Sequence, residues 1–332
     1  MPNQRMNRRS VNNGRLAHLP VSLFGSVMGY SGLALAWRLA ASEFGLPGWI
    51  GEALAFVAVS IFLLLTLCYA IKCIESPEAV RAEFAHPVAV NFFGTPIISH
   101  SCCCLPVVAP YSAALTKALW LIGTVSMLSF AWLVVSRWMS VRQKIVHATP
   151  AWMIPIVGTL NISIVGVTLD VPGAQAVSAF GLAVGLFFAV PLFTLVLSRL
   201  IFEEPMLKAH WPSLLIFVAT FAVSFSAYLS VVGRVDLFAS SLFYLAVFMF
   251  AVLVPKLLLL RSTTPFHTSW WAVSFPLAAM SNAALKFNLY QQSWLAQAFA
   301  LAVLAFTTFV IMSMSVRTIA GIARGELRTL ML

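Results

Sequence analysis

The chain has 332 residues, of which 61% are hydrophobic and 9% are charged, and its mean hydropathy is +0.95. A soluble domain carries about 25% charged residues, so this composition excludes a soluble protein and indicates a chain that lies mostly in lipid. The formal net charge of +10 comes from basic residues dispersed over short loops, which argues against a nucleic-acid partner.

Ten apolar stretches are each long enough to cross a bilayer as a helix, which takes about 20 residues for a hydrocarbon core of about 30 Å. They lack the polar alternation of barrel strands, so helices are the remaining way to satisfy their backbone groups in lipid. We therefore expect an all-α polytopic membrane protein with spans at residues 20–41, 53–73, 87–107, 112–136, 150–169, 174–198, 212–231, 237–260, 270–287 and 293–316.

The basic residues predict the orientation of these spans. All Lys and Arg residues except Arg38, Lys117, Arg234 and Lys286 lie near the chain ends or the loops that follow every second span. The positive-inside rule then places both termini in the cytoplasm. We expect a cytoplasmic arm at 1–17, one membrane domain at 18–319 and a cytoplasmic tail at 320–332, without a second domain.

Glycine and proline distinguish the odd-numbered spans from the even-numbered ones. The odd spans hold 14 Gly and Pro residues and the even spans hold five. A proline stands at the start of four odd spans, namely Pro20, Pro87, Pro150 and Pro212. This recurrence predicts a helical hairpin repeated five times, with inner odd helices that form a pore and outer even helices that face lipid.

The third span carries a polar stripe. Asn91, Thr95 and Ser99 recur at every fourth residue and so share one helix face, which either lines a wet pore or joins helices by hydrogen bonds. We predict pore lining. His100 follows the stripe and is either a proton relay or a neutral, hydrogen-bonded packing residue.

Three consecutive cysteines, Cys102, Cys103 and Cys104, lie in the same span. Neighbouring helix positions point about 100° apart, so these thiols cannot close a tetrahedral metal site among themselves. We expect them to be small packing residues and expect no metal site.

Two basic residues lie near the outer ends of odd spans. Arg38 and Lys286 either attract anions to an outer mouth, or extend to the headgroups or pair with Glu43 or Glu52. Residue types alone leave both alternatives open.

Four stretches carry a resemblance to a known family: HLPVSLFGSVMGYSGLALAWR, HPVAVNFF, TPAWMIPIVGTLN and WWAVSFPLAAMSNAALKF. In them the chain, from His18 to the end of the tenth span, resembles the voltage-dependent anion channel family. That family includes the plant guard-cell slow anion channel, bacterial tellurite-resistance proteins, and fungal malate permeases and sulfite pumps.

The resemblance implies a homotrimer of ten-helix protomers, each with its own pore, in the inner membrane of a bacterium. It assigns the pore gate to Phe275, which precedes Pro276, and the space facing that gate to Gly25. We expect Pro276 to bend its helix locally, and expect Gly25, Gly158 and Pro276 to line the pore. The long regulatory termini of the plant channels have no counterpart here, so kinase control is not carried over.

We therefore predict a passive pore for small inorganic or carboxylate anions, with no cofactor. The alternative is a secondary transporter or efflux carrier for C4-dicarboxylate, sulfite or tellurite oxyanions. An enzyme is not expected, because the chain has no glycine-rich phosphate loop, paired acids in the spans or metal-spaced histidines.

Overall fold

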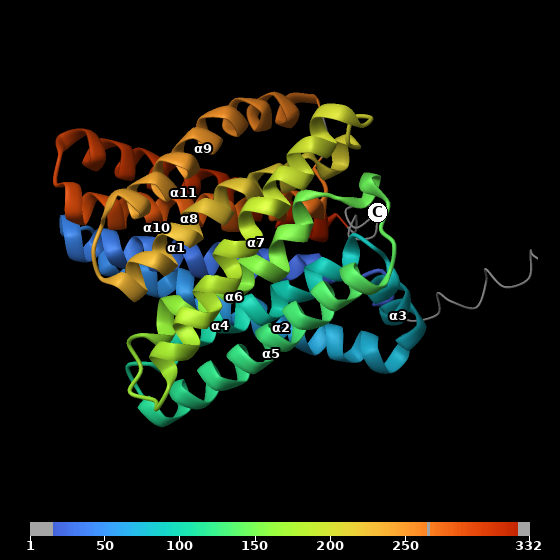
Figure 1. Cartoon of the computed structure of the whole chain (residues 1–332), viewed down its shortest axis with the longest axis horizontal. Helices are drawn as coiled ribbons and strands as arrows, with labels where there is room; N and C mark the ends of the chain where they lie inside the picture. The colour runs from blue at the N-terminus through green and yellow to red at the C-terminus, as the bar shows by residue number, and fades with distance from the viewer. Residues whose placement is uncertain (1–15, 264–265, 325–332) are drawn as a thin grey trace, which may run out of the picture.

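The part of the chain that the computed structural model describes, residues 16–263 and 266–324, is largely helical. Its α-helices (Figure 1) are α1 (Phe24–Phe44), α2 (Gly48–Glu75), α3 (Pro77–Ala85), α4 (Gly94–Val108), α5 (Ala113–Ser140), α6 (Ile154–Gly166), α7 (Ala174–Phe202), α8 (Ile216–Val232), α9 (Leu237–Thr263), α10 (Ser274–Gln291) and α11 (Trp294–Ala323). Seven helical segments in these ranges are long and apolar enough to cross a membrane. The prediction of an all-α polytopic membrane protein is confirmed.

The predicted terminal segments lie largely beyond these ranges. Residues 1–15 and 325–332 are outside the described part of the chain. At the C-terminal end, α11 continues to Ala323 and so passes the predicted domain boundary at residue 319.

Five α-helices are preceded directly by a 3-10 segment. These segments are η1 (Val21–Leu23), η2 (Ala89–Phe93), η4 (Pro150–Met153), η5 (Lys208–Leu215) and η6 (Thr268–Val273), which lead into α1, α4, α6, α8 and α10. Pro20 caps η1, Pro150 begins η4 and Pro212 lies within η5. The four prolines that the sequence places at α-helix starts therefore lie in or just before 3-10 segments, with Pro87 two residues before η2, and the α-helices begin later.

The helices with 3-10 starts form a closed ring. Around it, α1 contacts α4, α4 contacts α6, α6 contacts α8, α8 contacts α10, and α10 returns to α1. The five 3-10 segments make the same circuit, from η1 through η2, η4, η5 and η6 back to η1. All five inner helices therefore start at one end of the molecule and run in the same direction.

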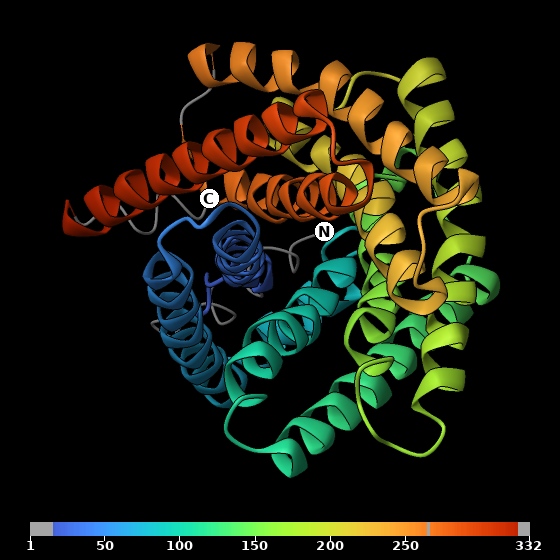
Figure 2. The ribbon, with the colours of Figure 1, turned by 90° about the vertical axis from the view of Figure 1, so that its left-hand side faces the viewer.

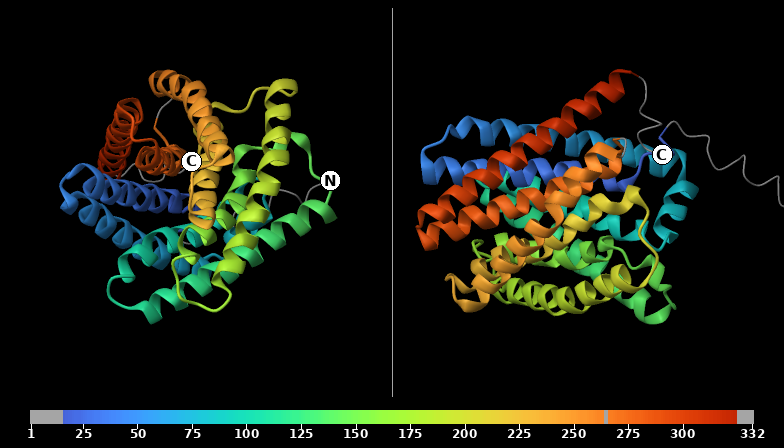
Figure 3. Two further views of the ribbon diagram at one scale, coloured as in Figure 1. Left: turned by 60° about the vertical axis from the view of Figure 1, so that its left-hand side comes forward. Right: turned by 90° about the horizontal axis from the view of Figure 1, so that it is seen from above.

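The other long helices form an outer layer. Each of α2, α5, α7, α9 and α11 packs against its preceding inner helix and against the next inner helix of the ring. Figure 2 shows this end-on, with the dark blue α1 inside the blue α2 and the orange α10 inside the red α11. The views in Figure 3 show the long helices of both layers lying roughly side by side along the bundle.

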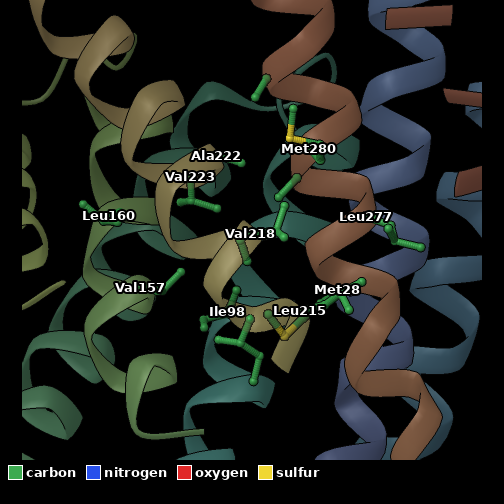
Figure 4. Packing of buried hydrophobic residues seen from close by; sticks show 14 of the residues in the cluster. Met28, Ile98, Val157, Leu160, Leu215, Val218, Ala222, Val223, Leu277 and Met280 are labelled. Atoms are coloured by element: carbon green, nitrogen blue, oxygen red, sulfur yellow. The ribbon is translucent and has the colours of Figure 1, made fainter. Parts of the chain in front are cut away.

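Burial separates the two layers. In the inner segment His210–Val232, 78% of the most apolar stretch is buried. In the outer helix Gly48–Glu75, only 17% of the corresponding stretch is buried. Large apolar side chains such as Phe56, Trp132 and Phe187 are exposed on the outer helices, as expected for a surface in lipid. Figure 4 shows core side chains contributed by all the inner helices.

Glycines let α1 and α10 approach closely. A Cβ atom on Gly29 would lie 2.3 Å from Ser274 Cβ, and one on Gly32 would lie 2.8 Å from Ala278 Cβ. Ser274 also donates a hydrogen bond from Oγ to the carbonyl of Gly25, at 3.0 Å. The first and the last inner helices, about 250 residues apart in sequence, thus pack with their backbones close together.

The short helix α3 anchors the start of α1 through a buried ion pair. Glu83 accepts hydrogen bonds from Lys72 Nζ at 2.7 Å, Tyr69 Oη at 3.0 Å and the backbone N–H of Val21 at 2.8 Å. Lys72 Nζ also donates to the carbonyl of Leu19 at 2.7 Å. These bonds satisfy both charges of the pair and fix the entry of the chain into η1.

Candidate functional site

Phe275, the second residue of α10, separates two cavities inside the ring of inner helices. We name them by the ends of these helices. The helix-start cavity, with about 460 Å³ of empty space, is lined by residues that include Gly25, Ile98 and Phe275. The helix-end cavity, with about 650 Å³, is lined by residues that include Asn161, Lys286 and again Phe275. The same side chain thus borders both spaces inside the ring.

The helix-start cavity is mostly apolar. Side chains from α1, α4, α6 and α8 face it: Met28, Ile98, Val157 and Ala219. Three of these (Met28, Ile98 and Val157) are labelled in Figure 4. A narrow apolar passage closed by an aromatic ring excludes water and therefore denies an ion its hydration.

A third cavity, the vestibule, lies among the 3-10 segments. Its lining is rich in hydroxyl groups, since Ser22, Thr149, Ser213, Thr268 and Ser269 all border it. Thr149 is buried, and its Oγ1 atom has no hydrogen-bond partner among the described residues. His210 also borders the vestibule.

The vestibule lies at the N-terminal ends of the inner helices. Five helix starts converge beside it, and unpaired N–H groups and the positive ends of helix dipoles favour negative charge. The described residues that line the three cavities include no Asp or Glu. Nothing in these linings therefore offsets the positive potential of the helix starts.

The helix-end cavity contains one charged side chain among its described lining residues, Lys286. Phe275, Ala279, Asn282 and Lys286 follow one another at spacings of four, three and four residues and all line this cavity. This spacing is one face of an α-helix, so α10 presents a continuous stripe from the aromatic ring to the lysine. Asn282 was not predicted from the sequence, although it lies at helical spacing from Phe275 and Lys286.

A family model described as "Voltage-dependent anion channel" matches residues 18–319, nearly the whole chain. The chain belongs to the voltage-dependent anion channel family. The prediction from the four sequence stretches is thus confirmed, as is the prediction of a membrane transport protein and not an enzyme.

Named relatives span plants and bacteria. The chain is 29% identical over 311 residues to the S-type anion channel SLAH3 of Arabidopsis thaliana, covering 92% of this chain and 48% of that protein. The chain is 25% identical over 320 residues to the guard cell S-type anion channel SLAC1 of the same plant, covering 92% of this chain and 56% of that protein. For the tellurite resistance protein TehA homolog of Haemophilus influenzae, identity is 30% over 279 residues, covering 81% of each. The chain spans about half the length of these plant relatives.

Gly25 and Pro276 line the helix-start cavity, as Phe275 does. A Cβ atom on Gly25 would come no closer than 3.5 Å to another group, the carbonyl oxygen of Trp271, so this position has room. Pro276 is the third residue of α10, immediately after η6. It therefore lies at the change from 3-10 to α-helix, whereas a bend inside a longer helix was expected.

The polar stripe of the third span faces α1 more than the cavities. Ser99 Oγ donates to the carbonyl of Phe24 at 2.9 Å, and Asn91 Nδ2 bonds the carbonyls of Pro87 and Val88. Only Thr95 borders a cavity, and it too donates to a neighbouring carbonyl, that of Val21 at 3.2 Å. The expectation of pore lining is thus corrected for Asn91 and Ser99, because their side chains are fully buried and their hydrogen bonds are to backbone carbonyls.

Three further predicted residues also lie away from the cavities described above. Gly158 faces α5, where an added Cβ atom would lie 2.4 Å from Met127 Sδ, so it is a packing glycine and not a lining residue. His100 lies beside Phe62 of α2, with ring centroids 6.4 Å apart, and beside Gly123 of α5. Arg38 forms a bidentate ion pair with Glu52, at 2.9 and 2.8 Å, which is one of the two alternatives.

The cysteine triplet is split between different surroundings. Cys102 borders the helix-end cavity and donates from Sγ to Asn161 Oδ1 at 3.7 Å, while Cys103 is buried. Among the described residues no group of three His, Cys, Asp or Glu side chains is arranged to hold a metal ion.

Proposed function

We propose that this chain is an anion channel whose pore runs inside the ring of α1, α4, α6, α8 and α10 and is closed by Phe275. The observation that carries the proposal is that Phe275 borders both the helix-start cavity and the helix-end cavity inside the ring. Phe275 and Lys286 are also the two residues between 273 and 288 that are only partly buried, as expected for side chains that face a lumen. In this proposal ten helices cross the membrane as five hairpins.

Charge selection has a source at each end of the pore. At the vestibule, five parallel helix starts and a hydroxyl-rich lining stabilise an anion. At the other end, where the negative helix ends converge, Lys286 supplies a positive charge beside the lumen. Small anions such as chloride, nitrate or a carboxylate fit this arrangement better than cations, because the described lining residues contain no carboxylate.

The vestibule side is assigned to the cytoplasm by the positive-inside rule. The protein then lies in the inner membrane of a bacterium, with residues 1–17 and 320–332 as cytoplasmic arms. A reporter fused after Leu332 is expected to be active in the cytoplasm and one inserted beside Pro172 in the periplasm. The reverse pair of results contradicts this orientation.

The experiment that tests the gate compares three proteins in liposomes that report chloride or nitrate efflux. Phe275→Ala removes the aromatic plug and leaves Pro276 in place, so its efflux is expected to exceed that of the unmodified protein at least tenfold. Phe248→Ala is the matched control, because Phe248 is 64% exposed on the outer helix α9. It is expected to change nothing.

Equal efflux from folded Phe275→Ala and unmodified protein would place the barrier to ions elsewhere than at Phe275.

The same efflux assay distinguishes a channel from a carrier. Efflux that rises with anion concentration without saturation, and does not respond to a pH gradient, is the result that a channel predicts. Saturating efflux driven by a pH gradient favours the carrier.

A further inference from the structure

The polar groups around the helix-end cavity are mostly hydrogen-bond acceptors. Ser31 Oγ donates to the carbonyl of Val27 at 2.8 Å, and Ser101 Oγ donates to that of Ile97 at 3.3 Å. Asn161 Nδ2 donates to the carbonyl of Val157 at 3.1 Å. The two serines have committed their single O–H donors to their own helices, and Asn161 has committed one of its two N–H groups, so these residues offer a ligand mainly oxygen lone pairs.

Asn282 follows the same pattern with a clearer geometry. Its Nδ2 atom donates two hydrogen bonds of 2.8 Å, to the carbonyls of Gly32 on α1 and Ala278 on α10. Because only the amide nitrogen can bond two carbonyls, this network fixes which end of the side chain is oxygen. The oxygen, Oδ1, is buried and has no partner among the described residues.

A buried acceptor without a partner is costly, and a ligand that brings a donor removes that cost. Asn161 Oδ1 is only slightly better satisfied, since its partner is the weak donor Cys102 Sγ at 3.7 Å. Lys286, one helical turn beyond Asn282, places a positive charge on the same cavity. The cavity lining thus combines one cation, Lys286, with two amide oxygens that lack a strong hydrogen-bond donor, those of Asn282 and Asn161.

A bare anion such as nitrate satisfies only the lysine and faces the amide oxygens with its own lone pairs. We propose that the helix-end cavity binds monoanions that carry an O–H group, such as bicarbonate and other hydrogen oxyanions, in preference to anions without one. The negative oxygen pairs with Lys286, and the O–H group donates to Asn282 Oδ1 or Asn161 Oδ1. This inference rests on the proposed pore and specifies which anions its outer half prefers.

Bicarbonate and nitrate are suitable probes because both are planar monoanions of similar size and only bicarbonate carries a hydrogen. The measurement is the melting temperature of the full-length protein in mild detergent, titrated with potassium bicarbonate or potassium nitrate at constant ionic strength and near-neutral pH. Ligand-dependent stabilisation yields an apparent Kd for each anion. Bicarbonate is expected to bind about fivefold or more tightly than nitrate, since it makes one additional hydrogen bond to an unsatisfied acceptor.

Substitutions test which side chains cause the expected preference for bicarbonate over nitrate. Asn282→Leu and Asn161→Leu each remove one amide oxygen and are expected to reduce the preference for bicarbonate, whereas Lys286→Met weakens both anions. Asn288→Leu is the matched control. Asn288 lies on the same helix with an equally unpartnered Oδ1 atom, but it is not among the described residues that line the cavity. If Asn282→Leu fails to fold, Asn161→Leu still tests the proposal.

Equal affinity for the two anions, stabilisation by neither, or an unchanged preference in the folded Leu variants would overturn the inference. These outcomes bear only on the anion preference and leave the proposed channel function untouched. A Phe275→Ala protein that conducts nitrate while bicarbonate shows no advantage in binding leaves the channel intact and removes only this preference. Absence of anion current in that variant contradicts the channel whatever the binding result.

Discussion

The gating role proposed for Phe275 rests on the surroundings of this side chain and not on its residue type. The chain has 26 phenylalanines, and several, such as Phe217 and Phe225, are fully buried in the core. Phe275 differs because it borders a cavity on each side. Periodicity in the sequence does not separate these cases, and the family resemblance supplied the assignment. Asn282 was missed because an asparagine in a membrane helix reads equally well as an interhelical link.

Gly25 provides a residue-scale test of the lumen. Its position has room for a Cβ atom and borders the helix-start cavity, so Gly25→Asp is expected to fold and to place a carboxylate beside that cavity. In a Phe275→Ala background this change is expected to reduce anion efflux at least tenfold, because the new charge repels anions where the lining is apolar.

Gly25→Ala is the control for that change. It adds volume without charge, and the nearest group to its Cβ atom lies at 3.5 Å, so efflux is expected to stay within about twofold of the Phe275→Ala protein. Equal efflux from the Asp and Ala variants would mean that Gly25 does not face the conduction path.

At the scale of the elements, the sequence predicted the ten long helical segments and their alternation but not how the inner ones begin. The composition of spans such as 87–107 and 150–169 reads as continuous helix, whereas the structure starts each with a 3-10 segment. Proline is well tolerated in the first turn of an α-helix, so the prolines alone do not explain the 3-10 starts, which instead coincide with contacts among the five segments. Those contacts lie far apart in sequence and so leave no local signal.

The helix α3 was also not predicted, because a nine-residue segment with three charged side chains between two spans resembles an ordinary loop. Its importance lies in the Glu83–Lys72 pair, whose side chains are 14% and 3% exposed. Glu83→Gln leaves a buried Lys72 without a counter-charge and is expected to destabilise the protein by about 3–5 kcal/mol. The measurement is thermal or denaturant unfolding in detergent.

An exposed ion pair provides the comparison for that prediction. Glu52, which pairs with Arg38, is 66% exposed, so Glu52→Gln is expected to cost less than about 1 kcal/mol. Equal losses of stability for the two variants would contradict the view that α3 anchors the start of α1 through a buried pair.

At the scale of the whole molecule, the outer helices expose apolar surface all around the bundle, for example at Phe56, Trp132 and Phe187. Lipid covers such a surface, and so can a second copy of the chain. The family resemblance favours three copies, each with its own pore. Native mass spectrometry from mild detergent is expected to show a trimer, and a dominant monomer or dimer would count against it.

The central claim is that anions pass through the ring of inner helices once Phe275 is removed. Its most direct test is the reversal potential of Phe275→Ala protein in a planar bilayer that separates two concentrations of potassium chloride. The helix starts, Lys286 and the absence of carboxylates among the described lining residues predict a reversal potential close to the equilibrium potential of chloride. A reversal potential close to that of potassium, or no current from folded protein, would contradict the account.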